Sequence, residues 1–304
     1  MVSWGKAIVS SLICVAWCFL WLFIGGSMVI YGIYLIRYGS NYYLQVTILI
    51  IVGLVIIGLP FNTAFFKFFP ETINKGEITW GEAFRGSASY FGSAVYWGAM
   101  CFTLSPGTIA GAIGIRGSYY QTLASIITGD EIEGKSAWNA SGHMFGWVLL
   151  WVLVGGIIIL FGFVFLNQYI LEYYYELVIL VLTIVTALYL MIMGISAAEF
   201  KEFSDIIIYG EIRWEDSYRA AVKYAAWCIL WLFIGGFLIY LGFFTRLYPP
   251  RNLPPMPRVI SNIFYYVIYY INPIIISAIG VFILAWGCLS AYIKYFGDIL
   301  EVIT

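Results

Sequence analysis

Charged residues are scarce in this 304-residue chain. They make up 10% of it, against roughly 25% in an average soluble domain, whereas apolar residues make up 62%. Several apolar runs exceed the roughly 18 residues that mark a membrane-spanning helix. The net charge of -1 offers no general attraction for nucleic acid or for acidic substrates. The sequence therefore predicts an all-α, polytopic transmembrane helical bundle that lies in a lipid bilayer and binds no nucleic acid.

Motifs for metal binding and catalysis are also missing. The single histidine, His143, excludes a haem with two histidine ligands, and no C-x-x-C pair suggests zinc or a redox dithiol. The HExxH, GxSxG and Walker A spacings do not occur in a usable context. We therefore predict no metal, no cofactor and no catalytic residue. The cysteines are odd in number and lie in apolar segments, which indicates packing rather than a disulfide framework: Cys14, Cys18, Cys101, Cys228 and Cys288.

One phrase of eleven residues occurs twice. AWCFLWLFIGG at 16–26 and AWCILWLFIGG at 226–236 differ at a single position. Weaker versions of the same pattern lie between them, so we interpret the chain as one membrane domain, 1–304, built by internal duplication. The predicted repeat units are 4–78, 80–131, 133–212 and 214–299.

Each unit is long enough for a helical hairpin, because a hydrocarbon core of about 30 Å needs roughly 20 helical residues. This gives about eight helices. Ten of the fifteen basic residues then fall on the face that holds both termini and four on the other, which predicts a cell (plasma) membrane protein with cytoplasmic termini. The predicted spans are 8–36, 44–66, 86–104, 108–127, 144–166, 177–198, 220–244 and 273–293.

A stripe of tryptophan and glycine recurs at spacings of four, which places its members on one helix face. Small residues allow helix backbones to approach in lipid while bulky neighbours interlock around them, so we predict a helix-packing stripe. Aromatic residues that line a substrate cavity are the alternative. The residues are Trp17, Trp21, Gly25, Trp97, Trp147, Trp151, Gly155, Trp227, Trp231 and Gly235.

A glycine followed by an acid recurs near the end of every unit. Glycine is the usual residue in the left-handed cap of a helix, so we predict cytoplasmic helix caps. A rim of acidic loops that docks a partner is the alternative. The residues are Gly76 and Glu77, Gly129 and Asp130, Gly210 and Glu211, and Gly297 and Asp298.

Arg116 lies at the middle of the predicted span 108–127. A cation at that depth costs at least roughly 2.5–3.5 kcal/mol, so it is a candidate for binding an anionic or polar ligand. No acid lies at comparable depth in the other predicted spans, and Glu199 is expected on a solvated extension of its helix, so we predict no salt bridge for Arg116. Gly111, Gly114 and Gly117 surround the arginine and allow a ligand or a helix to approach closely.

An alternative interpretation makes residues 87–115 one helix. Arg116 then lies at the membrane surface, the chain has seven helices, and the later units are inverted. The repeat and the distribution of basic residues favour eight helices.

The stretch INKGEITWGEAFR at 73–85 resembles an element of several prokaryotic polytopic families. These include the membrane domain attached to some glycerophosphodiester phosphodiesterases, and a poorer echo lies at 207–217. The resemblance implies a membrane protein without the hydrolase domain. The Ile-, Tyr- and Trp-rich composition also resembles that of thermophilic archaeal membrane proteins.

Three functional hypotheses follow. The first is a non-catalytic structural or accessory subunit of a membrane assembly, with other membrane subunits or further copies of the chain as partners. The second is a transporter or channel in which Arg116 meets a polar or anionic solute between duplicated halves. The third is a lipid-handling membrane enzyme, which we rank last because the sequence shows no pair of intramembrane acids and no nucleophile with a base.

Overall fold

The computed structural model describes residues 2–37, 43–74, 76–101, 106–168, 173–208, 210–247 and 271–301. These residues form eight α-helices and no strand, which confirms the predicted all-α fold. The helices are α1 (Trp4–Arg37), α2 (Tyr43–Asn74), α3 (Trp80–Cys101), α4 (Pro106–Thr128), α5 (Gly134–Gln168), α6 (Tyr173–Ile208), α7 (Trp214–Leu247) and α9 (Asn272–Glu301).

Six of these helices are long and apolar enough to cross a membrane, so the chain is a multi-pass membrane protein. The other two, α3 and α4, have 22 and 23 residues and carry more small and polar side chains. The α3–α4 hairpin therefore differs in kind from the other three, although all four were predicted as pairs of spans.

The helices extend past the predicted spans at one end. The second helix of each long hairpin runs on: α2 reaches Asn74 instead of 66, α6 reaches Ile208 instead of 198, and α9 reaches Glu301 instead of 293. The first helices begin early in the same way, with α5 starting at Gly134 instead of 144. These extensions hold about half of the residues of the buried core, Phe69, Phe203 and Phe296 among them.

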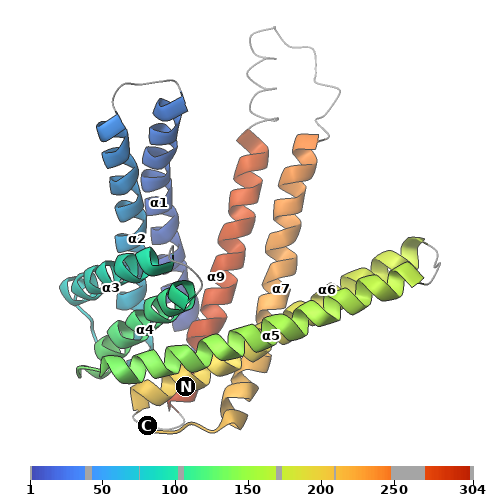
Figure 1. Ribbon diagram of the computed structural model, residues 1–304. Coiled ribbons are helices and arrows are strands. Elements are labelled where there is room, and N and C mark those ends of the chain that lie inside the picture. Colours follow the sequence, from blue (N-terminus) through green and yellow to red (C-terminus); the bar gives the residue numbers. More distant parts are fainter. Residues whose placement is uncertain are drawn as a thin grey trace.

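The four hairpins form a closed ring. Within each hairpin α1 packs on α2, α3 on α4, α5 on α6 and α7 on α9, and neighbouring hairpins meet through α2–α3, α4–α5, α6–α7 and α9–α1. The second helices α2, α4, α6 and α9 also contact one another in a cycle at the centre. In Figure 1 the α1–α2 and α7–α9 hairpins extend upwards from this region, whereas the α5–α6 hairpin extends to the right. The hairpins therefore join at one end and diverge beyond it.

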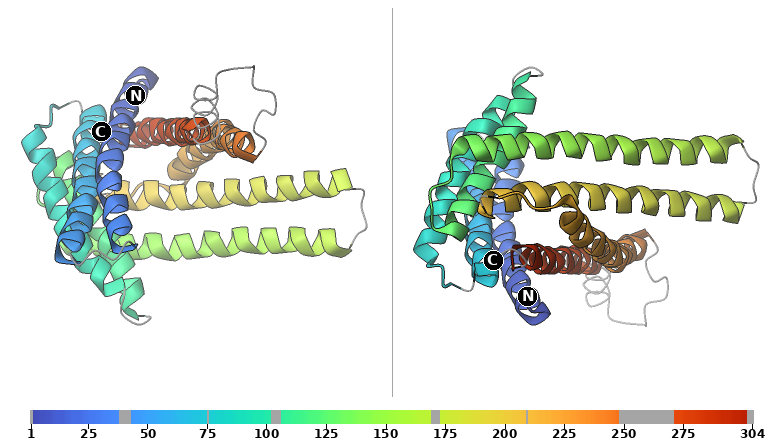
Figure 2. Two further views of the ribbon diagram at one scale, coloured as in Figure 1. Left: turned by 90° about the horizontal axis from the view of Figure 1, so that it is seen from above. Right: turned by 90° about the horizontal axis from the view of Figure 1, so that it is seen from below.

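The core lies where the hairpins join. Its centre is a set of fully buried aromatic side chains from the inner helices, with Phe69 of α2, Phe203 of α6 and Phe296 of α9 among them. Phe203 and Phe296 stack with ring centroids 5.2 Å apart. The two ends of the chain belong to the same region, because a Cβ on Gly297 would lie 2.5 Å from the Val2 side chain. Both views of Figure 2 show the α5–α6 hairpin extending away from this region.

Serine hydroxyls link one hairpin to the preceding one at three of the four interfaces. Ser87 of α3 donates to the carbonyl of Leu59 at 2.7 Å, and Ser141 of α5 donates to the carbonyl of Ile113 at 2.7 Å. At the closing interface the hydroxyls of Ser11 and Ser290 lie 2.5 Å apart. Each hydroxyl thus ties the first helix of one hairpin to the second helix of the preceding one.

Tryptophan pairs link the first helices of the hairpins around the outside. Each pair joins one first helix to the next, with ring centroids 5.0 to 5.8 Å apart, and the last pair returns to α1. Aromatic pairs at this separation stabilise a contact by about 0.5–1.5 kcal/mol beyond their buried area. The pairs are Trp17–Trp80, Trp97–Trp138, Trp147–Trp214 and Trp227–Trp4.

Glycines of the predicted stripe lie at close helix contacts inside the hairpins. A Cβ on Gly25 would lie 2.5 Å from the carbonyl oxygen of Gly53, and one on Gly235 would lie 2.6 Å from that of Gly280. Three tryptophans of the stripe cover glycines of the paired helix in a related way. They are Trp97 over Gly114, Trp151 over Gly194 and Trp231 over Gly287.

We predict that Gly235→Ala lowers the melting temperature of the protein in mild detergent, because the new methyl group collides with the backbone of α9. The neighbouring variant Gly236→Ala is the matched control, since a Cβ there meets nothing within 4 Å. It should leave the melting temperature unchanged or raise it slightly, because alanine favours a helix interior by roughly 0.5–1 kcal/mol over glycine. Equal melting temperatures for the two variants would contradict the close α7–α9 contact.

Candidate functional site

Arg116 belongs to α4, and α4 is separate from α3. The rings of Trp97 in α3 lie against Gly114 in α4, and the Thr108 hydroxyl donates to the carbonyl of Cys101 at 3.0 Å. Helices that pack side by side cannot be one continuous helix. The alternative of a single helix over residues 87–115 is therefore wrong.

Arg116 forms a salt bridge with Glu199, which contradicts the prediction that no acid lies at its depth. Glu199 is 5% exposed, so the prediction of a solvated position for it is also wrong. The physical reason is the length of α6: the helix continues to Ile208 and packs against α4 over its extension. An acid just past the predicted end of the span at 198 therefore lies inside the protein.

Two tyrosine hydroxyls complete the environment of the Glu199 carboxylate. Tyr120 donates to Oε2 at 2.8 Å, and Tyr292 of α9 donates to Oε1 at 3.3 Å. The Arg116 guanidinium also lies over the rings of Tyr119 and Tyr120, 5.0 and 4.9 Å from their centroids. A buried charge requires such compensation, because an unpaired one costs several kcal/mol in a low-dielectric region. The cluster joins α4, α6 and α9.

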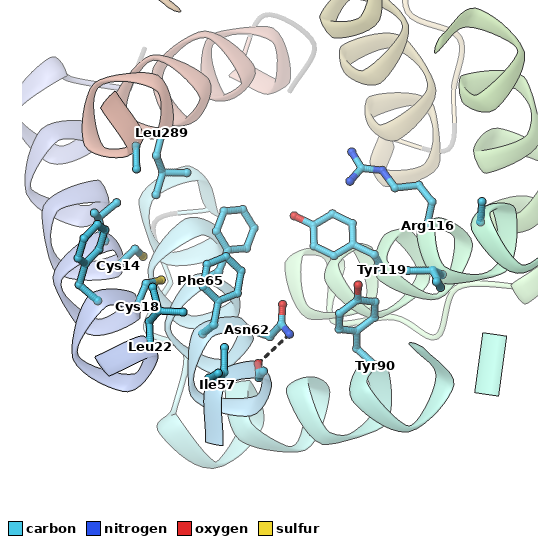
Figure 3. Close-up of a pocket in the computed structure, with 17 residues that line it drawn as sticks. Cys14, Cys18, Leu22, Ile57, Asn62, Phe65, Tyr90, Arg116, Tyr119 and Leu289 are labelled. Atoms are coloured by element: carbon cyan, nitrogen blue, oxygen red, sulfur yellow. Dashed lines mark hydrogen bonds between the residues drawn. The ribbon is translucent and has the colours of Figure 1, made fainter. Parts of the chain in front are cut away.

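A cavity of about 1030 Å³ lies beside this cluster. It is bounded by α1, α2, α3, α4 and α9, and its walls are mainly apolar. Figure 3 shows Cys14, Cys18 and Leu22 of α1 on one side, with Tyr90, Tyr119 and Arg116 on the other. The Arg116 side chain is 40% exposed, so part of it is open to this space. Arg116 thus belongs both to a buried ion pair and to the wall of a cavity.

The glycines around Arg116 face other helices instead of a ligand. A Cβ on Gly111 would lie 2.6 Å from the carbonyl oxygen of Trp97, and one on Gly114 would lie within the Trp97 ring. Gly117 faces the α5 backbone, with 3.5 Å between its Cβ position and the carbonyl oxygen of Ala137. The sequence predicted that these glycines allow either a ligand or a helix to approach closely, and the structure shows the close approach of helices.

The glycine-acid elements fall into two groups. Gly76, Gly129 and Gly210 follow the ends of α2, α4 and α6, and among the described glycines only Gly129 has a positive φ, of 77°. Gly297 lies inside α9, where Val2 covers it, so the prediction of a helix cap there is wrong. The acids after the first three glycines are exposed side chains: Glu77, Asp130 and Glu211.

In the loops after α2, α4 and α6, a side chain near the end of the helix accepts a hydrogen bond from the loop backbone. These acceptors were not predicted from the sequence. The Glu71 carboxylate accepts from the backbone N–H of Ile78 at 3.0 Å. Seven residues also separate donor and acceptor in the equivalent loops, where Ile132 donates to Ser125 at 3.2 Å and Ile212 donates to Asp205 at 2.7 Å. The sequence does carry a signal for them, because a Lys or Gln lies four residues before each acceptor: Lys67, Gln121 and Lys201. The same spacing recurs in the fourth unit, where Lys294 precedes Asp298.

The first turn of α3 carries a capping box. The backbone N–H and the hydroxyl of Thr79 both donate to the Glu82 carboxylate, at 2.9 and 2.8 Å. These hydrogen bonds lower the pKa of the exposed Glu82 carboxyl below its ordinary value. Glu82, which belongs to the stretch 73–85, therefore has a local structural role at the start of the helix.

His143 lies away from the Arg116 cluster. Its Nδ1 is 3.4 Å from the Glu202 carboxylate, and its side chain is 70% exposed. Both residues line a second cavity of about 610 Å³. No group of three or more His, Cys, Asp or Glu side chains that could hold a metal ion occurs in the described part of the chain.

Comparison of the chain with models of known protein families, with curated proteins and with solved structures gave no match. The resemblance of residues 73–85 to polytopic families stays a prediction. The arguments for a function therefore rest on the cluster around Arg116, the cavity and the arrangement of the hairpins.

We predict that Glu199→Gln lowers the melting temperature substantially, because it leaves the Arg116 cation without its counter-ion. The double variant Arg116→Gln with Glu199→Gln should recover part of the loss, with a coupling of about 1–3 kcal/mol in a double-mutant cycle measured by unfolding in detergent. The control is Glu202→Gln, whose partner His143 is exposed, and it should change the free energy by less than about 1 kcal/mol. Additive effects of the two site variants would show that the ion pair is not formed.

Proposed function

We propose that the chain is a non-catalytic structural or accessory subunit of a membrane assembly. The observation that carries this proposal is the divergence of the hairpins beyond their shared core. Away from the core their apolar side chains are widely exposed, with Phe23 at 78%, Ile30 at 70% and Phe161 at 71%. Divergent apolar hairpins leave space between them for helices of other subunits or of further copies of the chain.

The compensated charges of the cluster suit a structural role. The Glu199 carboxylate of α6 forms an ion pair with Arg116 of α4 and accepts hydrogen bonds from tyrosine hydroxyls of α4 and α9. It therefore joins three of the four inner helices. The Glu199 carboxylate accepts from all these donors and is not left free to abstract a proton from a substrate. A cluster of this kind fixes the relative positions of the hairpins and provides a rigid base for an assembly.

The recurring contacts support internal duplication. Three kinds of contact recur at related positions in several hairpins: serine hydroxyls that bond the preceding hairpin, tryptophan pairs, and side chains that accept from a loop N–H. In this proposal each unit is one hairpin, and the α3–α4 unit has diverged most. The termini and the core lie on the cytoplasmic side of the cell membrane, in agreement with the excess of basic residues at that end.

A transporter for a polar or anionic solute is the second candidate, because Arg116 lines the cavity of about 1030 Å³. The salt bridge with Glu199 weakens this candidate, since the carboxylate already occupies part of the guanidinium. The mainly apolar lining gives a polar solute few other partners.

The test is purification of the full chain from its native membrane in mild detergent after expression at its natural level. We predict that membrane proteins co-purify in fixed ratio, as measured by native mass spectrometry, or that the chain forms a defined oligomer. A lone monomer that takes up small anions in proteoliposomes, with the uptake lost in Arg116→Leu, would contradict the proposal and establish the transporter.

A further inference from the structure

We propose that the cavity beside Arg116 binds one membrane lipid, with its acyl chain along α1 and α2 and a phosphate-containing head group at Arg116. This inference does not depend on the role of the chain in an assembly. It rests on the division of the cavity into an apolar part and a polar part, and on donors in the polar part that have no partner.

The apolar part of the cavity matches an acyl chain. Its walls are Cys18 and Leu22 of α1, Ile57 and Phe61 of α2, and Leu289 of α9. The thiol of Cys14, which also lines the cavity, donates to the carbonyl of Ala64 at 3.6 Å and offers no free donor. At about 1030 Å³ the cavity lies at the upper end of the range of ligand sites, which suits a long, flexible ligand.

The polar part holds hydroxyls without partners. Among the described residues none forms a hydrogen bond with the hydroxyl of Tyr90 or of Tyr119, although both rings line the cavity. Figure 3 shows these two side chains and Arg116 on the side of the cavity away from Cys14 and Leu22, with Asn62 between the two sides. Polar groups in an apolar surrounding cost roughly 1–3 kcal/mol each when they have no partner. An occupant with a polar group at this end removes that cost.

The free groups in the polar part of the cavity are mainly hydrogen-bond donors, so the matching ligand group is one that accepts hydrogen bonds. A guanidinium has five N–H donors, and Glu199 occupies only part of them. Asn62 uses one N–H for the carbonyl of Gly58 at 2.9 Å and keeps another. Phosphate oxygens accept several hydrogen bonds, and those from a cation are the strongest. A phospholipid head group fits this set better than a head group that is itself rich in donors.

A lipid also fits better than a free phosphate ion. The donors lie at one end of a cavity whose remaining walls offer mainly apolar contact, which an acyl chain covers. A free phosphate would leave that surface uncovered. The proposal therefore commits to the lipid, and the experiment separates the two ligands.

The experiment reconstitutes the full chain in vesicles of phosphatidylglycerol and phosphatidylcholine that contain a trace of phosphatidylglycerol with a photoreactive acyl chain. After illumination, mass spectrometry locates the attached lipid. We expect attachment to peptides of α1 and α2 that line the cavity. The double variant Tyr90→Phe with Tyr119→Phe keeps both rings but removes the hydroxyls, and it should reduce attachment there about tenfold.

Two further variants complete the design. Tyr96→Phe is the matched control, because Tyr96 lies in α3 outside the cavity and is 62% exposed, so attachment should be unchanged. Ala112→Phe places a ring in the cavity and should reduce attachment without removing any polar group. Melting temperatures equal to that of the unaltered protein show that each variant is folded.

Attachment spread over all exposed helices, or attachment at the cavity that the tyrosine and Ala112 variants leave unchanged, would overturn the proposal. So would competition by millimolar inorganic phosphate as effective as that by unlabelled phosphatidylglycerol, which would identify a free anion as the ligand. Each result is independent of whether partner proteins co-purify.

Discussion

The ion pair between Arg116 and Glu199 is the constraint on which the arrangement of the inner helices depends. A buried carboxylate is tolerated only when its partners are fixed, and here the carboxylate and its partners come from three helices. Tyr120 cannot move away without leaving Oε2 of the Glu199 carboxylate unpaired. The cluster therefore fixes how α4, α6 and α9 meet, and it also sets the polar end of the neighbouring cavity.

Other contacts hold the four hairpins together around the ring. Hydrophobic force between helices is weak in lipid, so close packing and interhelical hydrogen bonds must hold the hairpins together. Glycine contacts such as Gly25 on Gly53 act within hairpins, and serine hydroxyls and tryptophan pairs act between them. Because the serine and tryptophan contacts between hairpins lie toward the joined end, the distal parts of the long hairpins are free to meet lipid or other proteins.

The class of protein and its hairpins could be predicted from the sequence, because apolar length and repeated phrases report directly on helices that cross a membrane. The partner of Arg116 could not, because hydropathy marks where an apolar run stops and not where the helix stops. Glu199 lies just past such a run, on a helix that continues to Ile208. Gly297 was misplaced for the same reason, since α9 continues through it. The cavity depends on the angles between hairpins, which apolar length and residue spacing do not report.

The closed ring is tested most directly at the contact between the first helix and the last, where the hydroxyls of Ser11 and Ser290 lie 2.5 Å apart. In a variant whose native cysteines are replaced, Ser11→Cys with Ser290→Cys should form an intramolecular disulfide on mild oxidation in membranes, detected by mass spectrometry. Ser10→Cys with Ser290→Cys is the control, because Ser10 faces Thr72 of α2. A disulfide in the first variant and none in the control is the predicted result. Its absence from the first variant in folded protein would contradict the closed ring.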